Sequence, residues 1–167
     1  HAMNELRYIF RHSLLREAAY DMQLRTRLRE LHQLIAEAIE TLYPNSPERF
    51  IDLAFHYEQA EVDEKTNFYL EKAAENAKRN YQNRSALKYF GKLIENLLTS
   101  EADEEKLVKI LLRKGAVQEL IGEWEDAENN YRDAMERAQK LNNAFLAGRS
   151  YRRLGYLMLL RGVYPDA

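Results

Sequence analysis

Histidines are the residues of this 167-residue chain whose spacing most directly tests for metal chemistry. His1 belongs to residues 1–3, which we interpret as a cloning remnant, so His12, His32 and His56 remain. A metal site on a helix needs a second ligand three or four residues from the first. The positions at that spacing around His32 hold Leu28, Arg29, Ile35 and Ala36. The pattern therefore predicts no metal site, and we expect the histidines to pack or form hydrogen bonds.

Other catalytic and cofactor patterns are also missing from the sequence. No serine stands in a nucleophile elbow, no carboxylate pair stands out among the 27 Asp and Glu residues, and there is no Gly-x4-Gly-Lys-Ser/Thr phosphate loop. Cysteine is absent, which removes disulfides, thiolate metal ligands and cysteine nucleophiles, and fits a reducing, cytoplasmic compartment. We therefore expect a chain that is not an enzyme and needs no cofactor.

The overall composition is typical of a helical protein. Hydrophobic residues make up 46% and charged residues 31%, with only three prolines and six glycines. The formal net charge of -2 provides no bulk positive field to attract nucleic acid or an anionic membrane. No apolar run is long enough to span a bilayer. The composition thus argues against nucleic-acid and membrane partners.

Apolar residues recur at steps of three and four through the chain, which predicts an all-α protein. Two helices, near residues 13–22 and 24–42, are expected before the break at residues 44–47, where two prolines end helical geometry. Beyond it the pattern predicts helices near residues 48–60, 64–80, 83–98, 103–121, 125–141 and 144–161. We expect residues 4–44 to link to a missing upstream module and residues 48–167 to form an α-α superhelix of hairpins.

An internal repeat supports the hairpin prediction. Shifting the chain by 40 residues places Gly115 on Gly155, Gly122 on Gly162, Trp124 on Tyr164 and Ala127 on Ala167. A looser copy lies 41 residues upstream, with Leu70, Ala74, Ala86 and Phe90 on Leu111, Gly115, Ala127 and Tyr131. Small residues let helix backbones approach, and large aromatic residues fill the wedge between hairpins. We therefore predict that the repeats pack through Ala74, Ala86, Phe90, Gly115, Trp124, Ala127, Tyr131, Ala134 and Gly155.

The segment covering residues 107–138 resembles a tetratricopeptide repeat. The resemblance is carried by Gly115, Gly122, Trp124, Ala127, Tyr131 and Ala134. It implies a right-handed superhelix of helix hairpins that binds a protein partner. The period of 40 residues is longer than the roughly 34 of a typical tetratricopeptide repeat, so the helices should be correspondingly long.

A second resemblance covers residues 8–98. Its motifs are Phe10-x-His12-x-Leu14, Arg16-Glu17-x2-Tyr20, Arg29-x2-His32 and Leu53-Ala54-x-His56-Tyr57. They are similar to the segment after the nucleotide-binding module in bacterial AAA/STAND-type signalling ATPases, often fused to class III adenylate or guanylate cyclase, kinase or DNA-binding domains. The resemblance implies a regulatory piece of a larger signalling protein, with any ATPase or cyclase activity outside this chain.

The repeat geometry also predicts where a partner binds. In such superhelices the first helix of each hairpin lines the concave face, and its exposed positions select the partner. The predicted groove residues are Lys78, Arg79, Lys109, Leu112, Ala116, Glu119, Arg149, Arg152 and Tyr156, with Phe68, Glu71 and Glu75 beside them. The cations Lys109, Arg149 and Arg152 suit a carboxylate or an acidic peptide, but the asparagines of the chaperone-binding carboxylate clamp are not matched. The alternative for each cation is a solvated surface charge.

The last predicted helix, near residues 144–161, is apolar on more than one face. Its apolar residues include Tyr151, Leu154, Tyr156, Leu157, Met158, Leu159 and Leu160. The alignment places Ala167 where the second helix of this hairpin would begin, so we expect a truncated last repeat. An exposed apolar surface there predicts self-association.

These features predict a non-catalytic protein-protein interaction and regulatory module. Its expected partners are a protein or peptide, or adjacent domains of the parent protein. The alternative is a fragment of a transcription regulator that contributes to DNA binding, with Arg25, Arg27 and Arg29 contacting phosphates. A hydrolytic enzyme has no supporting motif in the sequence.

Overall fold

The computed structural model describes residues 13–99 and 103–162, and the regular secondary structure in these residues is entirely helical. The elements are α1 (Ser13–Leu42), the 3-10 helix η1 (Pro47–Arg49), α2 (Phe50–Gln59), α3 (Asp63–Arg79), α4 (Asn83–Thr99), α5 (Glu104–Leu120), α6 (Trp124–Lys140) and α7 (Ala144–Leu160). The all-α prediction is confirmed, and the helix bounds predicted after residue 47 agree to within two residues. The predicted remnant at residues 1–3, His12 and Ala167 lie outside the described residues.

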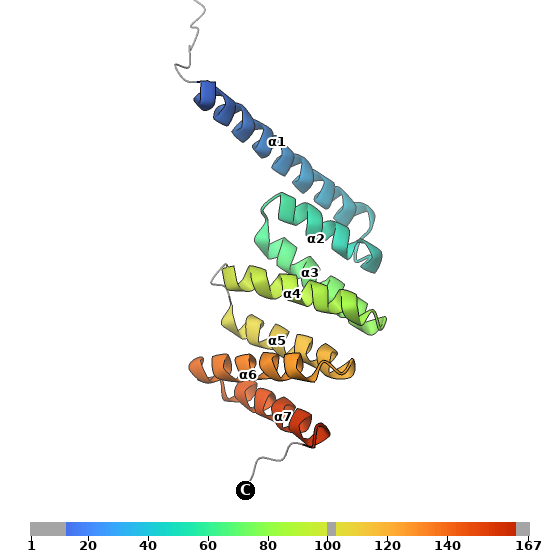
Figure 1. Ribbon diagram of the computed structural model, residues 1–167. Helices are drawn as coiled ribbons and strands as arrows, with labels where there is room; N and C mark the ends of the chain where they lie inside the picture. Colours follow the sequence, from blue (N-terminus) through green and yellow to red (C-terminus); the bar gives the residue numbers. More distant parts are fainter. Residues whose placement is uncertain (1–12, 100–102, 163–167) are drawn as a thin grey trace, which may run out of the picture.

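The helices stack in the order of the chain (Figure 1). Each helix packs against its neighbours in sequence, and α5 also contacts α7. The helices from α3 to α7 all have the same length, 17 residues. Equal lengths and short turns place α3, α5 and α7 as the alternate members of the stack. Residues about 40 positions apart therefore lie on corresponding helices.

The turns after α2, α3, α5, α6 and α7 share one backbone conformation. In each, the second residue after the helix is in the left-handed region: Glu61 at φ 56°, Tyr81 at 58°, Gly122 at 80°, Asn142 at 53° and Gly162 at 65°. The next amide N–H donates back to a carbonyl five residues earlier, as in the bond from Gln82 to Ala77 at 2.8 Å. The same bond runs from Val62 to Tyr57, from Glu123 to Gln118 and from Asn143 to Ala138. These are Schellman motifs, which satisfy the last carbonyls of a helix and end it.

Tyr81 is the strained member of this series. Tyr81 is 82% exposed, so it contributes little packing, and a non-glycine residue in the left-handed region costs about 1–2 kcal/mol. Replacing Tyr81 by glycine should therefore raise the free energy of unfolding by roughly 0.5–1 kcal/mol, after allowing for the larger entropy of glycine in the unfolded chain. Urea unfolding followed by circular dichroism measures the change.

The matched control is Gly122→Ala, at the corresponding turn of the next repeat. A Cβ at Gly122 would meet only the indole nitrogen of Trp124, at 3.8 Å, which is an ordinary contact. Its expected effect is thus a loss of about 1 kcal/mol from backbone strain alone, opposite in sign to that of Tyr81→Gly. If Tyr81→Gly and Gly122→Ala changed the free energy of unfolding in the same direction, the strain assigned to Tyr81 would be contradicted.

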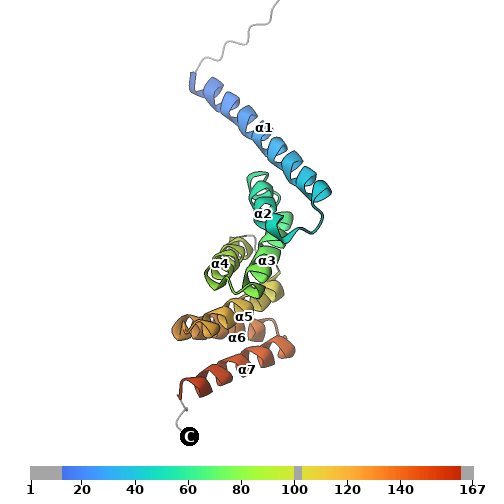
Figure 2. The ribbon, with the colours of Figure 1, turned by 90° about the vertical axis from the view of Figure 1, so that its right-hand side faces the viewer.

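The structure corrects the prediction of two N-terminal helices. α1 is a single helix of 30 residues. The residues at the expected break, Met22-Gln23-Leu24, include neither proline nor glycine and favour helix, so the backbone continues. Ala36, in the second half of α1, is buried, whereas Leu24 and Leu28 are exposed. Accordingly, the first half of α1 projects from the stack, and contacts with α2 and the turn after it begin near Arg29 (Figure 2).

Most of the predicted packing residues lie in the core. Six of them have no exposed surface: Ala74, Ala86, Phe90, Ala127, Tyr131 and Ala134. Gly115 is also buried, and a Cβ placed there would lie only 2.6 Å from Cε1 of Tyr131. Glycine at this position therefore allows α5 and α6 to approach across the tyrosine ring.

Trp124 and Gly155 do not occupy such positions, and the structure corrects both predictions. Trp124 is 38% exposed, because it begins α6 at the tip of the hairpin and lies beside Gly122. Gly155 is exposed on α7, and an added Cβ would meet no heavy atom of a neighbouring element within 4 Å. Neither residue mediates close helix packing among the described residues.

Candidate partner-binding groove

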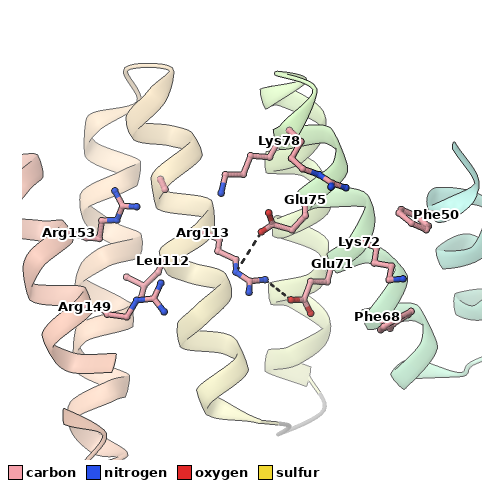
Figure 3. Close-up of a pocket in the computed structure, with 12 residues that line it drawn as sticks. Phe50, Phe68, Glu71, Lys72, Glu75, Lys78, Leu112, Arg113, Arg149 and Arg153 are labelled. Carbon is pink, nitrogen blue, oxygen red and sulfur yellow. Dashed lines mark hydrogen bonds and ion pairs between the residues drawn. The ribbon is translucent and has the colours of Figure 1, made fainter. Parts of the chain in front are cut away.

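A groove of about 710 Å³ crosses α3, α5 and α7 (Figure 3). It is lined by Phe50, Phe68, Glu71, Lys72, Glu75, Lys78, Arg79, Leu112, Arg113, Ala116, Arg149 and Arg153. Apart from Phe50 of α2, these side chains come from the three alternate helices of the stack. The volume lies within the range of about 300–1,000 Å³ that is usual for ligand-binding pockets. The groove is therefore large enough to hold several side chains of a bound segment.

Five of the nine predicted groove residues line this groove. They are Lys78 and Arg79 on α3, Leu112 and Ala116 on α5, and Arg149 on α7. Phe68, Glu71 and Glu75, which were expected beside them, line it as well. The structure thus brings together predicted residues that are up to 81 positions apart in sequence.

The other four predicted residues lie outside the lining, and these predictions are corrected. Lys109 pairs with Glu105 at 3.4 Å on its own helix, and Glu119 accepts a hydrogen bond from the Tyr131 hydroxyl at 2.7 Å. Arg152 and Tyr156 are exposed elsewhere on α7. One residue turns a helix by about 100°, and the alignment did not set the rotation of each helix to that accuracy.

The groove has an excess of positive charge. Six cationic side chains and two carboxylates line it, although the whole chain has a net charge of -2. Cations line all three helices, whereas both carboxylates, Glu71 and Glu75, are on α3. This concentration of charge in a hollow raises the local potential and attracts anions.

Both carboxylates are already paired within the groove. Nη1 of Arg113 lies 2.5 Å from Oε1 of Glu71, and its Nε lies 3.6 Å from Oε1 of Glu75. Lys106 adds a second partner for Glu71 at 3.3 Å. Figure 3 shows Arg113 reaching from α5 toward both carboxylates on α3. Arg113 therefore ties α5 to α3, and Arg113 and Lys106 together balance the charge of the two carboxylates.

Several cations in the groove keep their charge available. Among the described residues, Lys78 and Arg79 have no carboxylate within 4.0 Å, and Arg149 contacts the Phe145 ring at 5.8 Å from its centroid. Arg153 is only at the edge of contact with Glu119, at 4.0 Å. Because these positive charges are not neutralised internally, they can bind an anionic group.

Lys72 differs, because it covers the aromatic end of the groove. Its Nζ lies 4.6 Å from the centroid of the Phe68 ring and 5.3 Å from that of Phe50, and it donates to Oδ1 of Asn45 at 3.1 Å. Such cation–π contacts hold the ammonium group over the rings. At this end of the groove, the aromatic rings of Phe50 and Phe68 are therefore covered by the positive charge of Lys72.

Four lining residues were missed from the sequence: Phe50, Lys72, Arg113 and Arg153. Arg113 and Arg153 are 40 residues apart, which is the repeat period, and this coincidence was a usable signal. Phe50 comes from the helix before the first hairpin of the groove, so the repeat alignment does not reach it.

The histidines lie outside the groove, where α1 meets α2. Nδ1 of His32 is 2.9 Å from Nδ1 of His56, so one ring donates to the other. Burial and the neighbouring His32 lower the pKa of His56 below its ordinary value, although Asp52 opposes the shift. Over the part of the chain that the structure describes, no three His, Cys, Asp or Glu residues gather as a metal site would require.

The arginines considered for DNA binding are all on α1. Arg25 and Arg27 are exposed, and Arg29 forms an ion pair with Glu61. None of the three lines the groove.

The exposed apolar side chains predicted at the C-terminal end include Tyr151, Tyr156, Leu159 and Leu160, and self-association through them stays a prediction. Within residues 13–99 and 103–162, no helix is long and apolar enough to cross a membrane.

Comparisons with protein-family models and with curated proteins identified no relative of this chain. A scan against protein-family models finds no matching family. A search of curated proteins likewise finds no match. The groove and the helices that form it are therefore the features that bear on function.

Proposed function

We propose that this chain is a non-catalytic protein-protein interaction and regulatory module of a larger cytoplasmic signalling protein. It binds a segment of a partner protein, or of an adjacent domain, in the groove across α3, α5 and α7. One observation supports this proposal above the others. Side chains from three separate helices line a single hollow with both apolar and charged surface.

The arrangement suits binding better than catalysis. The lining side chains project from helices and therefore have a fixed spacing. They can contact successive residues of a bound segment along its length. The titratable groups of the groove are Glu, Lys and Arg, and both Glu side chains are occupied by Arg113. Among the described residues, no histidine, serine or tyrosine lines the groove to act as a nucleophile or a general base.

The proposal includes a superhelix of the tetratricopeptide type. The equal 17-residue helices and the Schellman turns at corresponding positions support it. In such an array an occupant contacts α3, α5 and α7 at once, so it restrains the angle between successive hairpins. A change in that angle reaches α1 through α2 and gives the module a route to an upstream domain.

The proposal is tested by selecting binding segments and then filling the groove. A random peptide library displayed on phage is selected against the unaltered chain, and the enriched peptides are measured with the variant Ala116→Trp. Ala116 lines the groove on α5, so the indole occupies space that the segment needs. We expect Ala116→Trp to weaken binding by at least about tenfold, the equivalent of roughly 1.4 kcal/mol.

The matched control is Ala38→Trp, which places the same side chain at an exposed position of α1 outside the groove. It should leave binding unchanged, and circular dichroism checks that both variants fold. The proposal is wrong if no peptide is enriched, or if the enriched peptides bind Ala116→Trp as tightly as the unaltered chain.

A further inference from the structure

The charges of the groove indicate which kind of segment binds there. Lys78 and Arg79 lie at the end of α3. Arg149 and Arg153 lie across the groove from Lys78, on α7 (Figure 3). Arg113 lies on α5 between these two walls, and its interactions are directed to Glu71 and Glu75. The free positive charge is therefore divided between two walls of the groove, with a neutralised centre.

Apolar surface lies between and beside these cations. Ala116 lines the groove on α5 beside the largely buried Leu112, and Phe68 is 45% exposed at the opposite end from α7. A ligand that uses the whole groove must therefore carry separated negative charges with apolar groups between them. A peptide with acidic residues around an aliphatic or aromatic side chain has this chemistry.

Resting on the function proposed above, we infer that the groove binds an internal acidic segment of a protein. Side-chain carboxylates of the segment pair with Lys78 or Arg79 on one wall and with Arg149 or Arg153 on the other. An apolar side chain of the segment packs over Leu112 and Ala116. The recognition does not require a chain terminus, because the cations are distributed on two helices instead of converging on one carboxylate.

The same contacts argue against nucleic acid as the occupant. Glu71 and Glu75 lie near the centre of the groove, where a continuous phosphate backbone would pass. Binding of single strands also needs exposed aromatic faces on which bases stack. Lys72 lies over the Phe68 ring, so its ammonium group competes for that aromatic face. A peptide can place neutral side chains opposite the two carboxylates, but a regular polyanion cannot.

The first experiment compares probes of one length with different charge. They are a fluorescein-labelled, C-terminally amidated peptide of alternating glutamate and leucine, the same peptide with glutamine or lysine in place of glutamate, and a labelled oligothymidylate. Fluorescence anisotropy gives each affinity. We expect the amidated glutamate peptide to bind at least about tenfold more tightly than the glutamine peptide, and added salt to weaken it.

The second experiment locates the binding by reversing charges. Arg149→Glu and Lys78→Glu should each weaken binding of the glutamate peptide by roughly fivefold or more, because an attraction becomes a repulsion. Arg152→Glu is the matched control, since it makes the same change three residues along α7 but outside the groove. It should change the affinity by less than about twofold.

The outcomes separate this inference from the proposed function. Enriched library peptides that are blocked by Ala116→Trp but are neutral or basic would keep the function and overturn the inference. Equal affinity for the glutamate and glutamine peptides, tighter binding of the oligothymidylate, or equal losses for Arg149→Glu and Arg152→Glu would also overturn it. A glutamate peptide that binds only with a free C-terminal carboxylate would contradict recognition of an internal segment.

Discussion

Replacing Tyr131 by alanine is expected to lower the free energy of unfolding by about 3–5 kcal/mol, the range for large aromatic residues removed from a core. Tyr131 of α6 has no exposed surface, and its ring lies against Gly115 of α5. Its hydroxyl donates to Oε2 of Glu119 at 2.7 Å. The truncation therefore leaves a cavity between two helices and removes a hydrogen bond at its edge. Urea unfolding at neutral pH measures the loss.

Two further variants separate the ring from the hydroxyl. Tyr131→Phe keeps the ring and should cost only about 1–2 kcal/mol, for one hydrogen bond to a charged acceptor. Gly115→Ala fills the same contact from the other side and should cost about 1–3 kcal/mol, because the ring cannot move freely. Tyr151→Ala is the surface control. Tyr151 is half-exposed, so this substitution should lower the free energy of unfolding by about 0.5 kcal/mol or less.

Equal losses for Tyr131→Ala and Tyr151→Ala would contradict the role given to the buried ring. A loss for Tyr131→Phe as large as that for Tyr131→Ala would assign the stability to the hydroxyl and Glu119 instead. In either case the contact between α5 and α6 would be held by something other than the ring.

The Tyr131 contact also illustrates what the sequence could predict. The pairing of a small residue on one helix with an aromatic residue 16 positions later occurs twice, as Ala74 with Phe90 and as Gly115 with Tyr131. Both pairs are buried in the structure. Turns, apolar spacing and small residues act locally, so they predict helix bounds and hairpin cores from one stretch of chain.

The rotation of each helix around its axis was harder to predict. Lys109 and Arg113 are one turn apart, and both are cations, but only Arg113 faces the groove. What directs Arg113 there is its contact with Glu71, which is 42 positions away in the chain. That contact depends on how two hairpins are oriented, and local sequence patterns carry little information about this orientation. The groove was thus predicted at the level of the helices and only in part at the level of residues.

α1 shows the same limit at the other end of the chain. Its apolar spacing correctly indicates a helix, but the spacing does not say which residues are covered. Leu28, Leu31 and Ile35 have the spacing of a packing face and are exposed. The residues that contact the stack include the apolar Ala36 and Ile39 and the polar His32 and Glu40. The polar half of this junction has no signature in hydrophobic periodicity.

Removing the carboxylate of Glu40 should weaken the contact of α1 with α2 and α3. Glu40 of α1 accepts hydrogen bonds from the hydroxyl groups of Tyr57 on α2 and Tyr69 on α3, and from Nζ of Lys65 at 2.9 Å. The two tyrosine rings are buried and stacked, with centroids 5.8 Å apart. Glu40→Ala leaves both hydroxyls without this acceptor, and we expect a loss of about 2–4 kcal/mol in the free energy of unfolding.

Glu37→Ala is the matched control, one turn earlier on the same helix. Glu37 is exposed, and among the described residues its carboxylate accepts a hydrogen bond only from Gln33, at 2.9 Å. The Thr41 hydroxyl donates to the backbone carbonyl of Glu37, which alanine keeps. Its loss should be about 0.5 kcal/mol or less. Similar losses for Glu37→Ala and Glu40→Ala would show that the Tyr57–Tyr69 cluster does not depend on α1.

Acidification provides an independent measure of the same junction. Burial alone would raise the pKa of Glu40, but hydrogen bonds from Lys65, Tyr69 and Tyr57 outweigh it and lower the pKa below 4.5. The folded state therefore binds this proton less readily than the unfolded chain. The stability that Glu40 provides is present above pH 4.5 and is lost as the pH falls through its lowered pKa.

Protonation of His56 should also lower the stability of the folded chain, but at a higher pH than protonation of Glu40. Its pKa is also lowered, from 6.5, so its contribution is present above pH 6.5 and decreases as the pH falls through the lowered value. Stability of the unaltered chain should therefore fall in two stages between pH 8 and pH 3, a span chosen to bracket both groups. His56→Gln should lack the stage nearer neutrality. Glu40→Ala should reduce the more acidic stage without abolishing it, because the hydrogen bond from Arg132 and the charge of Arg161 lower the pKa of Glu128 as well. A single stage that neither substitution alters would place the acid sensitivity elsewhere than at the junction of α1 with the stack.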